Sequence, residues 1–225
     1  MGGEDLFYKK RERKTSDFKR NSSSSNNPVK QTHARVLIVC EDSKSSVFYL
    51  KELAKDLGLN AVTVEGERCG SAPSSVLKFA QEQHANSVKD CDPYDRVYCV
   101  FDRDQHPCFE ATVQAISDIK SKNTFFAITT TPCFEFWLLL HFVYDTSPYQ
   151  PSGNKSSCDN ANSKLKSHWT DYGKSKRGIY TFTKDKTQTA VTNATQLASE
   201  NLKTGSNNPQ TNMHELIEYL QSIKR

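Results

Sequence analysis

The sequence lacks the features of a membrane or exported protein. It contains no run of eighteen apolar residues, so it predicts no transmembrane helix. The first residues are polar and charged, where a signal peptide would carry an apolar segment. Both absences favour a cytoplasmic protein that does not contact a membrane.

Paired cysteines are also missing. The seven cysteines are odd in number, are scattered along the chain and include no Cys-x-x-Cys pair. Two of them lie inside apolar strand patterns, where cysteine acts as a small hydrophobic residue. This usage favours reduced thiols over a disulfide framework or a zinc site.

The sequence has a small excess of positive charge, and this excess is unevenly distributed along the chain. The net charge is +4, and residues 1–34 carry eight Lys/Arg against four Asp/Glu, which accounts for the whole excess. Residues 35–144 hold 11 basic and 15 acidic side chains, whereas residues 155–186 hold eight basic and three acidic ones. An acidic body beside basic segments suits a metal site served by phosphate-binding surfaces, although ordinary solvated charge explains the counts equally well.

Three regions follow from the hydrophobic pattern. Residues 1–34 have no sustained apolar period and predict a basic tail that is disordered or ordered by a partner. Residues 35–144 predict the main folded domain, and residues 145–225 predict a basic loop with C-terminal helices packed on the same body. A long polar loop is expected over 145–163, and closing helices over 186–202 and 211–223.

The central region alternates short apolar runs with segments of helical period. The expected strands are 35–40, 61–65, 96–101 and 125–129, and the expected helices between them begin near 47, 73 and 109. The strands are apolar throughout, which is typical of strands buried on both faces. The fold class is therefore α/β, with a mostly parallel sheet and helices on both faces. After Pro132, the segment 133–142 is apolar nearly all round and predicts a buried helix.

Acidic residues follow two of the predicted strands. Glu41 comes directly after the first strand, and Asp102 and Asp104 follow the third. In a parallel sheet these strand ends share one edge, where ligands bind. Grouped carboxylates repel one another unless a hard cation is present, so the pattern indicates Mg2+, with Mn2+ as an alternative, while an ordinary acidic turn remains open. Lys44 would lie at the start of the next helix, either exposed or against a phosphate.

These residues belong to a wider resemblance. An apolar strand ending in Glu and another ending in Asp-x-Asp resemble the Toprim domain of topoisomerases, primases and OLD-type nucleases. The chain is most similar to the RloB-like family, on the four segments VLIVCEDSKSS, YCVFDRDQH, TPCFEFWLLLHF and NPQTNMHELIEYL, which together span Val36 to Leu220. The third segment is the most specific, because such an aromatic-rich run is improbable by chance.

The resemblance implies a function and roles for these residues. It implies that residues 35–144 form a catalytic domain with a Toprim-like fold, in which Glu41 is general acid/base or metal ligand and Asp102 and Asp104 are the metal-binding pair. It implies a magnesium-dependent endonuclease of anti-phage or abortive-infection loci, a hydrolase acting on phosphodiester bonds of RNA or DNA. Host transfer RNA is one substrate that the resemblance suggests, and an AAA-type ATPase is the implied controlling partner. The sequence does not distinguish a monomer from a homo-oligomer.

One segment departs from the family pattern. Where Gly-x-Lys-Thr-Glu is expected after Glu41, the chain has Asp42-Ser43-Lys44-Ser45-Ser46. Ser46 stands in place of a second acid, so Asp42 becomes a further candidate ligand. The alternative function is a catalytically weakened Toprim-like module that binds nucleic acid or the ATPase.

Two titratable residues interrupt the apolar segment after Pro132. Glu135 follows the fourth strand and is a candidate for the metal site, while His141 is expected to be a core residue with satisfied hydrogen bonds. On a regular helix they lie about 120° apart, so one small site does not use both.

Basic and aromatic residues alternate after residue 150. Such a composition suits single-stranded or looped nucleic acid, since cations neutralise phosphates and aromatic rings stack on bases. For Trp169 packing is the favoured role, and for Tyr172 packing and stacking both remain open. The predicted nucleic-acid-binding residues are Lys155, Lys164, Lys166, Lys174, Lys176 and Arg177.

Overall fold

The structure is a computed structural model that describes residues 34–70, 72–103, 106–119 and 124–224. The prediction of a basic tail over 1–34 falls almost wholly outside the described residues. The strands are β1 (Val36–Cys40), β2 (Val62–Glu65), β3 (Arg96–Asp102), β4 (Phe125–Thr131) and β5 (Gln210–Thr211). The helices are α1 (Ser45–Asp56), α2 (Pro73–Lys89), α3 (Phe109–Ser117), α4 (Phe134–Leu139), α5 (Ser157–His168), α6 (Ile179–Thr183), the 3-10 helix η1 (Lys184–Lys186), α7 (Thr187–Thr204) and α8 (Met213–Ser222).

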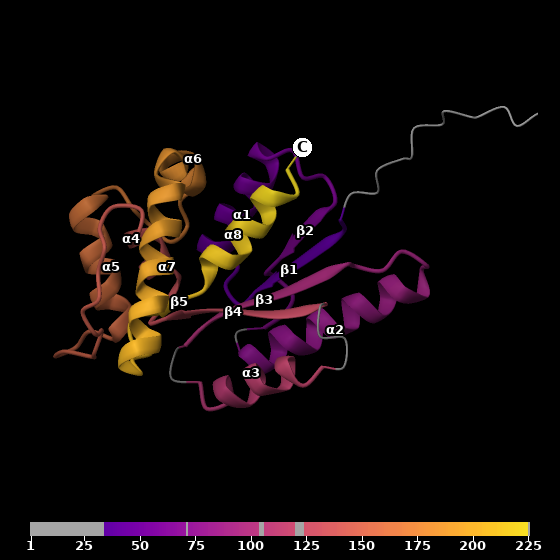
Figure 1. Ribbon diagram of the computed structural model, residues 1–225, viewed down its shortest axis with the longest axis horizontal. Helices are drawn as coiled ribbons and strands as arrows, with labels where there is room; N and C mark the ends of the chain where they lie inside the picture. Colours follow the sequence, from indigo (N-terminus) through magenta and orange to yellow (C-terminus); the bar gives the residue numbers. More distant parts are fainter. Residues whose placement is uncertain (1–33, 71, 104–105, 120–123, 225) are drawn as a thin grey trace, which may run out of the picture. The chain divides into compact units, whose positions relative to one another are not determined.

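The strands form one mostly parallel sheet in the order β2-β1-β3-β4-β5 (Figure 1). The first four strands pair in parallel, and β5 adds to β4 in the antiparallel direction. Cys40 pairs with Val100, and Asp102 pairs with Thr130, so the strands end at one common edge. The predicted α/β class with its mostly parallel sheet is confirmed, and the arrangement is consistent with the expected Toprim-like fold.

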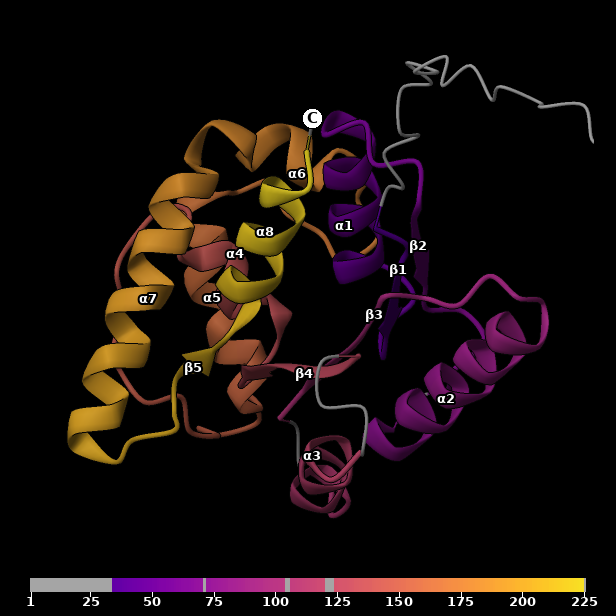
Figure 2. The same ribbon diagram turned by 45° about the vertical axis from the view of Figure 1, so that its right-hand side comes forward.

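Alternate residues of the central strands supply two separate cores. Leu37, Val39 and Cys99 join the core beneath α2 and α3, whereas Ile38 and Val100 join the larger core on the opposite face. Figure 2 shows α1 and α8 on one side of the sheet and α2 and α3 on the other. Burial on both faces explains why these strands are apolar at every position.

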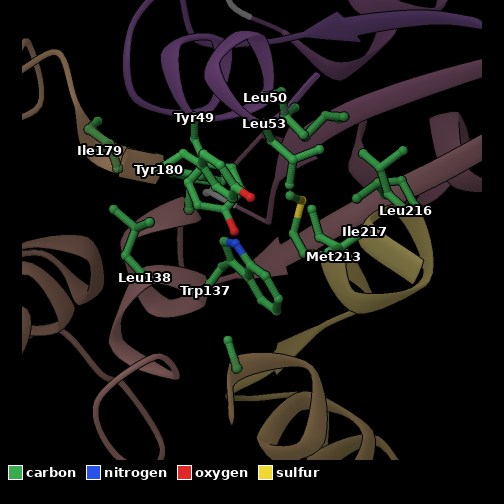
Figure 3. Packing of buried hydrophobic residues seen from close by; sticks show 14 of the residues in the cluster. Tyr49, Leu50, Leu53, Trp137, Leu138, Ile179, Tyr180, Met213, Leu216 and Ile217 are labelled. Carbon is green, nitrogen blue, oxygen red and sulfur yellow. The ribbon is translucent and has the colours of Figure 1, made fainter. Parts of the chain in front are cut away.

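The larger core packs helices from distant parts of the sequence together. Tyr49 of α1, Trp137 of α4, Tyr180 of α6 and Met213 of α8 meet in one cluster (Figure 3). The Tyr49 ring makes edge contacts with the rings of Trp137 and Tyr180 at centroid distances of 6.4 and 5.5 Å. This packing holds α4, including its N-terminal end, against the sheet.

The region after residue 144 differs most from expectation. The predicted loop 145–163 already contains the first half of α5, which begins with a capping box between Ser156 and Asp159. The sequence also did not predict α6 or β5, because both are too short for a clear period. Among the described residues, no helix combines the length and the apolar character that crossing a bilayer needs.

Candidate carboxylate site at the sheet edge

Three acids from two strand ends surround one small cavity. Glu41 and Asp42 follow β1, Asp102 ends β3, and all three line the cavity together with Ser46 and Phe134. Its volume is about 10 Å3, which is close to the minimum for one water or one small ion. The structure therefore brings Glu41 and Asp102 together at one edge of the sheet, as the sequence predicts.

Glu41 is tied to the neighbouring strand by both its backbone and its side chain. Its N–H donates to the carbonyl of Val100 at 2.9 Å, and its Oε2 accepts from the N–H of Asp102 at 3.1 Å. Nε2 of His106 lies 3.6 Å from Oε1 of Glu41. The carboxylate is therefore held beside Asp102, with an imidazole within reach of its other oxygen.

Asp42 is held by the serine that replaces the expected second acid. The N–H of Ser46 donates to Oδ2 of Asp42 at 3.1 Å, and the Ser46 hydroxyl donates to Oδ1. Burial raises the pKa of Asp42, and the negative charge of Glu135 raises it further, while the Ser46 hydrogen bonds act in the opposite direction. The altered segment thus keeps an acid at the edge, one residue after Glu41, and uses Ser46 to orient it.

A glycine allows the Asp42 segment its position. A Cβ on Gly66 would lie 2.5 Å from the carbonyl oxygen of Asp42 and 2.4 Å from Cγ2 of Val47. Real side chains do not tolerate such distances, so only glycine lets the segment after β2 pack this closely on the Asp42 backbone. No local pattern predicts this contact, because the two segments meet only in the folded sheet.

The pKa of Asp102 is shifted more strongly than that of Asp42. Burial raises its pKa well above the ordinary value, and the charges of Glu135 and Asp42 add to this effect. A hydrogen bond from the Phe134 N–H favours the ionised form and offsets part of the shift. Such a carboxylate gains free energy from any cation that enters the cluster.

Glu135 is buried at the start of α4, beside these acids. It is 2% exposed, and its Oε1 accepts a hydrogen bond from the Tyr172 hydroxyl at 2.9 Å. The Tyr172 hydroxyl also lies 3.2 Å from Oγ of Ser45, which in turn donates to the carbonyl of Lys174 at 3.1 Å. The predicted location of Glu135 near the edge agrees with its electrostatic effect on both Asp42 and Asp102.

Lys174 brings a positive charge to the acids. Its Nζ lies 3.8 Å from Oε1 of Glu135. Burial lowers the pKa of Lys174, but the negative charges of Glu135 and Asp102 outweigh that effect, so the pKa is raised and the ammonium form is favoured. The predicted nucleic-acid contact Lys174 therefore neighbours the carboxylates, whereas Lys44, at the N-cap of α1 as expected, is exposed and does not line their cavity.

The metal-ligand assignments stay predictions. The acids at the edge offer carboxylate oxygens, which suit Mg2+ or Mn2+. Within the described ranges, no three His, Cys, Asp or Glu side chains converge closely enough to hold one ion as they stand. Asp104, the predicted partner of Asp102, lies outside the described residues.

His141 lies apart from the carboxylates, in the core. Its Nε2 is 3.2 Å from the Tyr49 hydroxyl and its Nδ1 is 3.1 Å from the carbonyl oxygen of Trp137. Burial lowers its pKa to about 4. This is the satisfied core histidine that the sequence favoured.

The remaining predicted nucleic-acid-binding residues lie just before, on and after α5. Lys155, Lys166, Lys176 and Arg177 are exposed, while Lys164 pairs with the buried Asp145 at 2.8 Å. Lys164 therefore has a structural partner already. The packing roles of Trp169 and Tyr172 agree with their burial, at 4% exposure each.

Sequence reasoning missed several residues around the acids. Tyr172 and Ser45 support the Glu135 end, and the thiols of Cys133 and Cys158 lie near Asp102. Tyr172 comes 37 residues after Glu135 and 127 after Ser45, so no local spacing could connect them. The aromatic residues interleaved with the lysines were the one available signal.

The comparisons with known proteins gave one positive result. A family model described as RloB-like protein matches residues 36–220. In the other two comparisons, no curated protein and no solved structure matched the chain. The matched range covers the whole sheet and all the acids described above.

Proposed function

The chain belongs to the RloB-like protein family, and on that premise we propose that it is a metal-dependent nuclease that hydrolyses phosphodiester bonds of nucleic acid. The observation that carries the proposal is the convergence of Glu41, Asp42 and Asp102 on one cavity, with Glu135 close enough to raise the pKa of two of them. An acid cluster of this kind costs stability through desolvation and repulsion. A function that requires a cation explains why the cluster is present.

Mg2+ is the proposed cofactor, and Mn2+ would also suit the donors. When bound, the ion would polarise a phosphoryl oxygen and lower the pKa of a coordinated water. Asp102 and Glu41 would hold it, with Asp42 and Glu135 as further oxygen ligands and Asp104 as the second acid of the family pair. Burial, and then the charges of Glu135 and Asp42, raise the pKa of Asp102, and this supports the assignment because a bound cation would stabilise the ionised form against both effects.

The protein's own groups would position the substrate and move protons. Glu41 would accept or return a proton, and His106, 3.6 Å from its Oε1, would supply the imidazole that shares it. The Lys174 ammonium compensates the negative charge of Glu135. When substrate binds, this ammonium would leave the Glu135 carboxylate and pair with a substrate phosphate. Exposed cations on and after α5 would bind the flanking phosphates.

The biological setting is proposed from the family resemblance alone. It suggests an anti-phage role in the cytoplasm, RNA or DNA as substrate with host transfer RNA as one candidate, and control by an AAA-type ATPase. A second candidate function has its own support. No three described side chains form a ready metal group, and Ser46 replaces an acid, which favours a weakened module that binds nucleic acid or the ATPase.

Cleavage assays separate the two functions. Full-length protein, alone and with its ATPase, is incubated with single-stranded and duplex RNA and DNA in Mg2+, Mn2+ or chelator. The nuclease proposal expects products only with metal, and their loss in Glu41→Gln and Asp102→Asn but not in Asp118→Asn, an exposed acid after α3. Absence of metal-dependent product under every condition, or full activity of both site variants, would overturn it.

A further inference from the structure

A second and larger pocket opens at the same edge of the sheet. Its volume is about 480 Å3, within the range of about 300–1,000 Å3 typical of small-molecule sites. Arg103 directly follows Asp102. Thr131 ends β4, and Pro132 follows it two residues before Phe134, which lines the carboxylate cavity. The remaining walls come from the segment before α5, the first turn of α5 and the segment before β5. The pocket therefore lies next to the carboxylates without sharing their acids.

The chemistry of the walls is polar but uncharged, except for Arg103. Among the described residues, the lining includes the amides of Gln150, Asn207 and Asn208 together with Pro132 and Pro151, and it contains no carboxylate. A cationic ligand would find no countercharge among these side chains. A ligand with many hydrogen-bonding groups and a flat face would match the amides and the prolines.

Two of the amides are available to a ligand. Asn208 is occupied, since its Oδ1 accepts from the Tyr149 N–H at 3.0 Å and its Nδ2 donates to the Tyr149 carbonyl at 2.8 Å. This clamp fixes the two loops that form the pocket. Gln150 and Asn207 are exposed, and their side-chain amides make no hydrogen bond with any residue that the structure describes. Each such amide presents both a donor and an acceptor.

An unpaired nucleobase is the ligand that fits this set. Amide side chains form paired hydrogen bonds with base edges, and the rings of Pro132 and Pro151 provide apolar faces for the base plane. Arg103 supplies a guanidinium for the adjoining phosphate, although it also pairs with Glu110 on the surface. Enzymes that act on nucleic acid commonly hold a splayed-out base in such a pocket.

We propose that this pocket binds one unpaired nucleotide beside the phosphate that the carboxylates act on. The substrate class is then single-stranded or looped nucleic acid, and regular duplex is excluded because its base edges are paired. This inference rests on the proposed function for its role in cleavage. The binding of the nucleotide itself requires neither a metal nor a reaction.

The thiol of Cys158 reports on occupancy. Cys158 lines the pocket and is half-buried, whereas Cys91 is exposed in the turn after α2. Full-length protein in chelator is treated with iodoacetamide, with and without each of the four nucleoside monophosphates at millimolar concentration, and alkylation at each cysteine is read by mass spectrometry. We expect protection of Cys158 by at least about fivefold, with Cys91 unchanged.

Variants tie the protection to the pocket walls. The double variant Gln150→Ala/Asn207→Ala should weaken nucleotide binding by about tenfold, or 1.4 kcal/mol, while Asn154→Ala, an exposed amide outside the pocket, should not. Calorimetric titration of the same variants gives the affinities directly. All these residues are exposed, so folding is not at risk.

Three outcomes would overturn the inference. They are no protection by any nucleotide, equal protection by inorganic phosphate alone, and unchanged affinity in the double variant. Because the experiment is run in chelator, its failure is separate from that of the nuclease proposal. Cleavage without protection of Cys158 by nucleotides would overturn only the proposal for the pocket. Protection of Cys158 without cleavage would overturn only the nuclease proposal.

Discussion

The two hollows at the sheet edge differ in size and in charge. The smaller, of about 10 Å3, is walled by Glu41, Asp42 and Asp102, and the larger, of about 480 Å3, by amides, rings and one arginine. The segment from Thr131 to Phe134 borders both. A concentrated negative charge attracts a cation, whereas neutral hydrogen-bonding groups select the shape of a ligand. This contrast underlies the two proposals, which place the reaction at the smaller hollow and nucleotide binding at the larger one.

The largest expected effect comes from removing charge at the smaller hollow. Asp102→Asn or Glu41→Gln should lower the cleavage rate by at least about 100-fold, which is the usual scale for one acid-base or electrostatic group. Nucleotide protection of Cys158 should stay as in the wild type, because neither acid lines that pocket. Loss of both cleavage and protection in a folded variant would mean that the two hollows act as one.

The turn that follows α4 should make the fold sensitive to acid. Burial lowers the pKa of His141, two residues after the end of α4, to about 4, below the unfolded value of about 6.5. Between these values the unfolded chain binds more protons, so stability falls as the pH drops from about 6.5 to 4, by about 3 kcal/mol at most. Above pH 6.5 this contribution is fully present.

Denaturant unfolding at several pH values tests this prediction. His141→Gln can keep hydrogen bonds to Tyr49 and Trp137 but does not titrate, so its stability should vary less between pH 4 and 6.5. His84 and His214 also have pKa values lowered by burial, so the difference between wild type and variant isolates His141. Parallel pH curves for the two proteins would contradict the assignment.

A glycine substitution should disturb the smaller hollow more than the larger. Gly66→Ala would press a Cβ against the Asp42 carbonyl and Val47, at a cost of about 1–3 kcal/mol in unfolding free energy. Gly173→Ala is the matched control, since a Cβ there meets nothing within 4 Å. Urea unfolding measures both, and equal stability of the two variants would show that Asp42 does not need this support.

The smallest effect concerns the lysine that neighbours the acids. Lys174→Met should change stability by less than about 1 kcal/mol, because the lysine side chain is 58% exposed. Removing the competing cation should increase the apparent affinity for Mn2+ a few-fold, as measured by the shift of the unfolding temperature with metal concentration. Lys155→Met, an exposed lysine paired only with Ser163 among the described residues, is the control. A weaker Mn2+ response in Lys174→Met alone would reverse its proposed role.

The smaller hollow was more predictable from sequence than the larger. Glu41 and Asp102 directly follow apolar strands, and parallel strands bring their ends together, so local pattern was enough. Glu135 stood out as an acid inside an apolar helix, where burial without a partner is costly. Tyr172, Ser45 and Gly66 carry no comparable signal, because they join the acids only through tertiary contacts.

The larger hollow depends on the region that sequence reasoning described least well. Its walls come from the segment before α5 and the segment before β5, in a stretch expected to be loop. The α5 helix has few apolar residues, and β5 has two residues in all, so neither shows a strong period. Antiparallel addition of β5 to β4 is what brings Asn207 to the sheet edge.

The central claim is that the acids at the smaller hollow bind a divalent cation. Mn2+ binding to the full-length protein, followed by electron paramagnetic resonance of the free ion, tests it without substrate or turnover. We predict one or two bound ions per chain in the wild type and at least about tenfold weaker binding in Asp102→Asn, with Asp118→Asn unchanged. Undetectable binding in the wild type, or equal binding in Asp102→Asn, would contradict the claim.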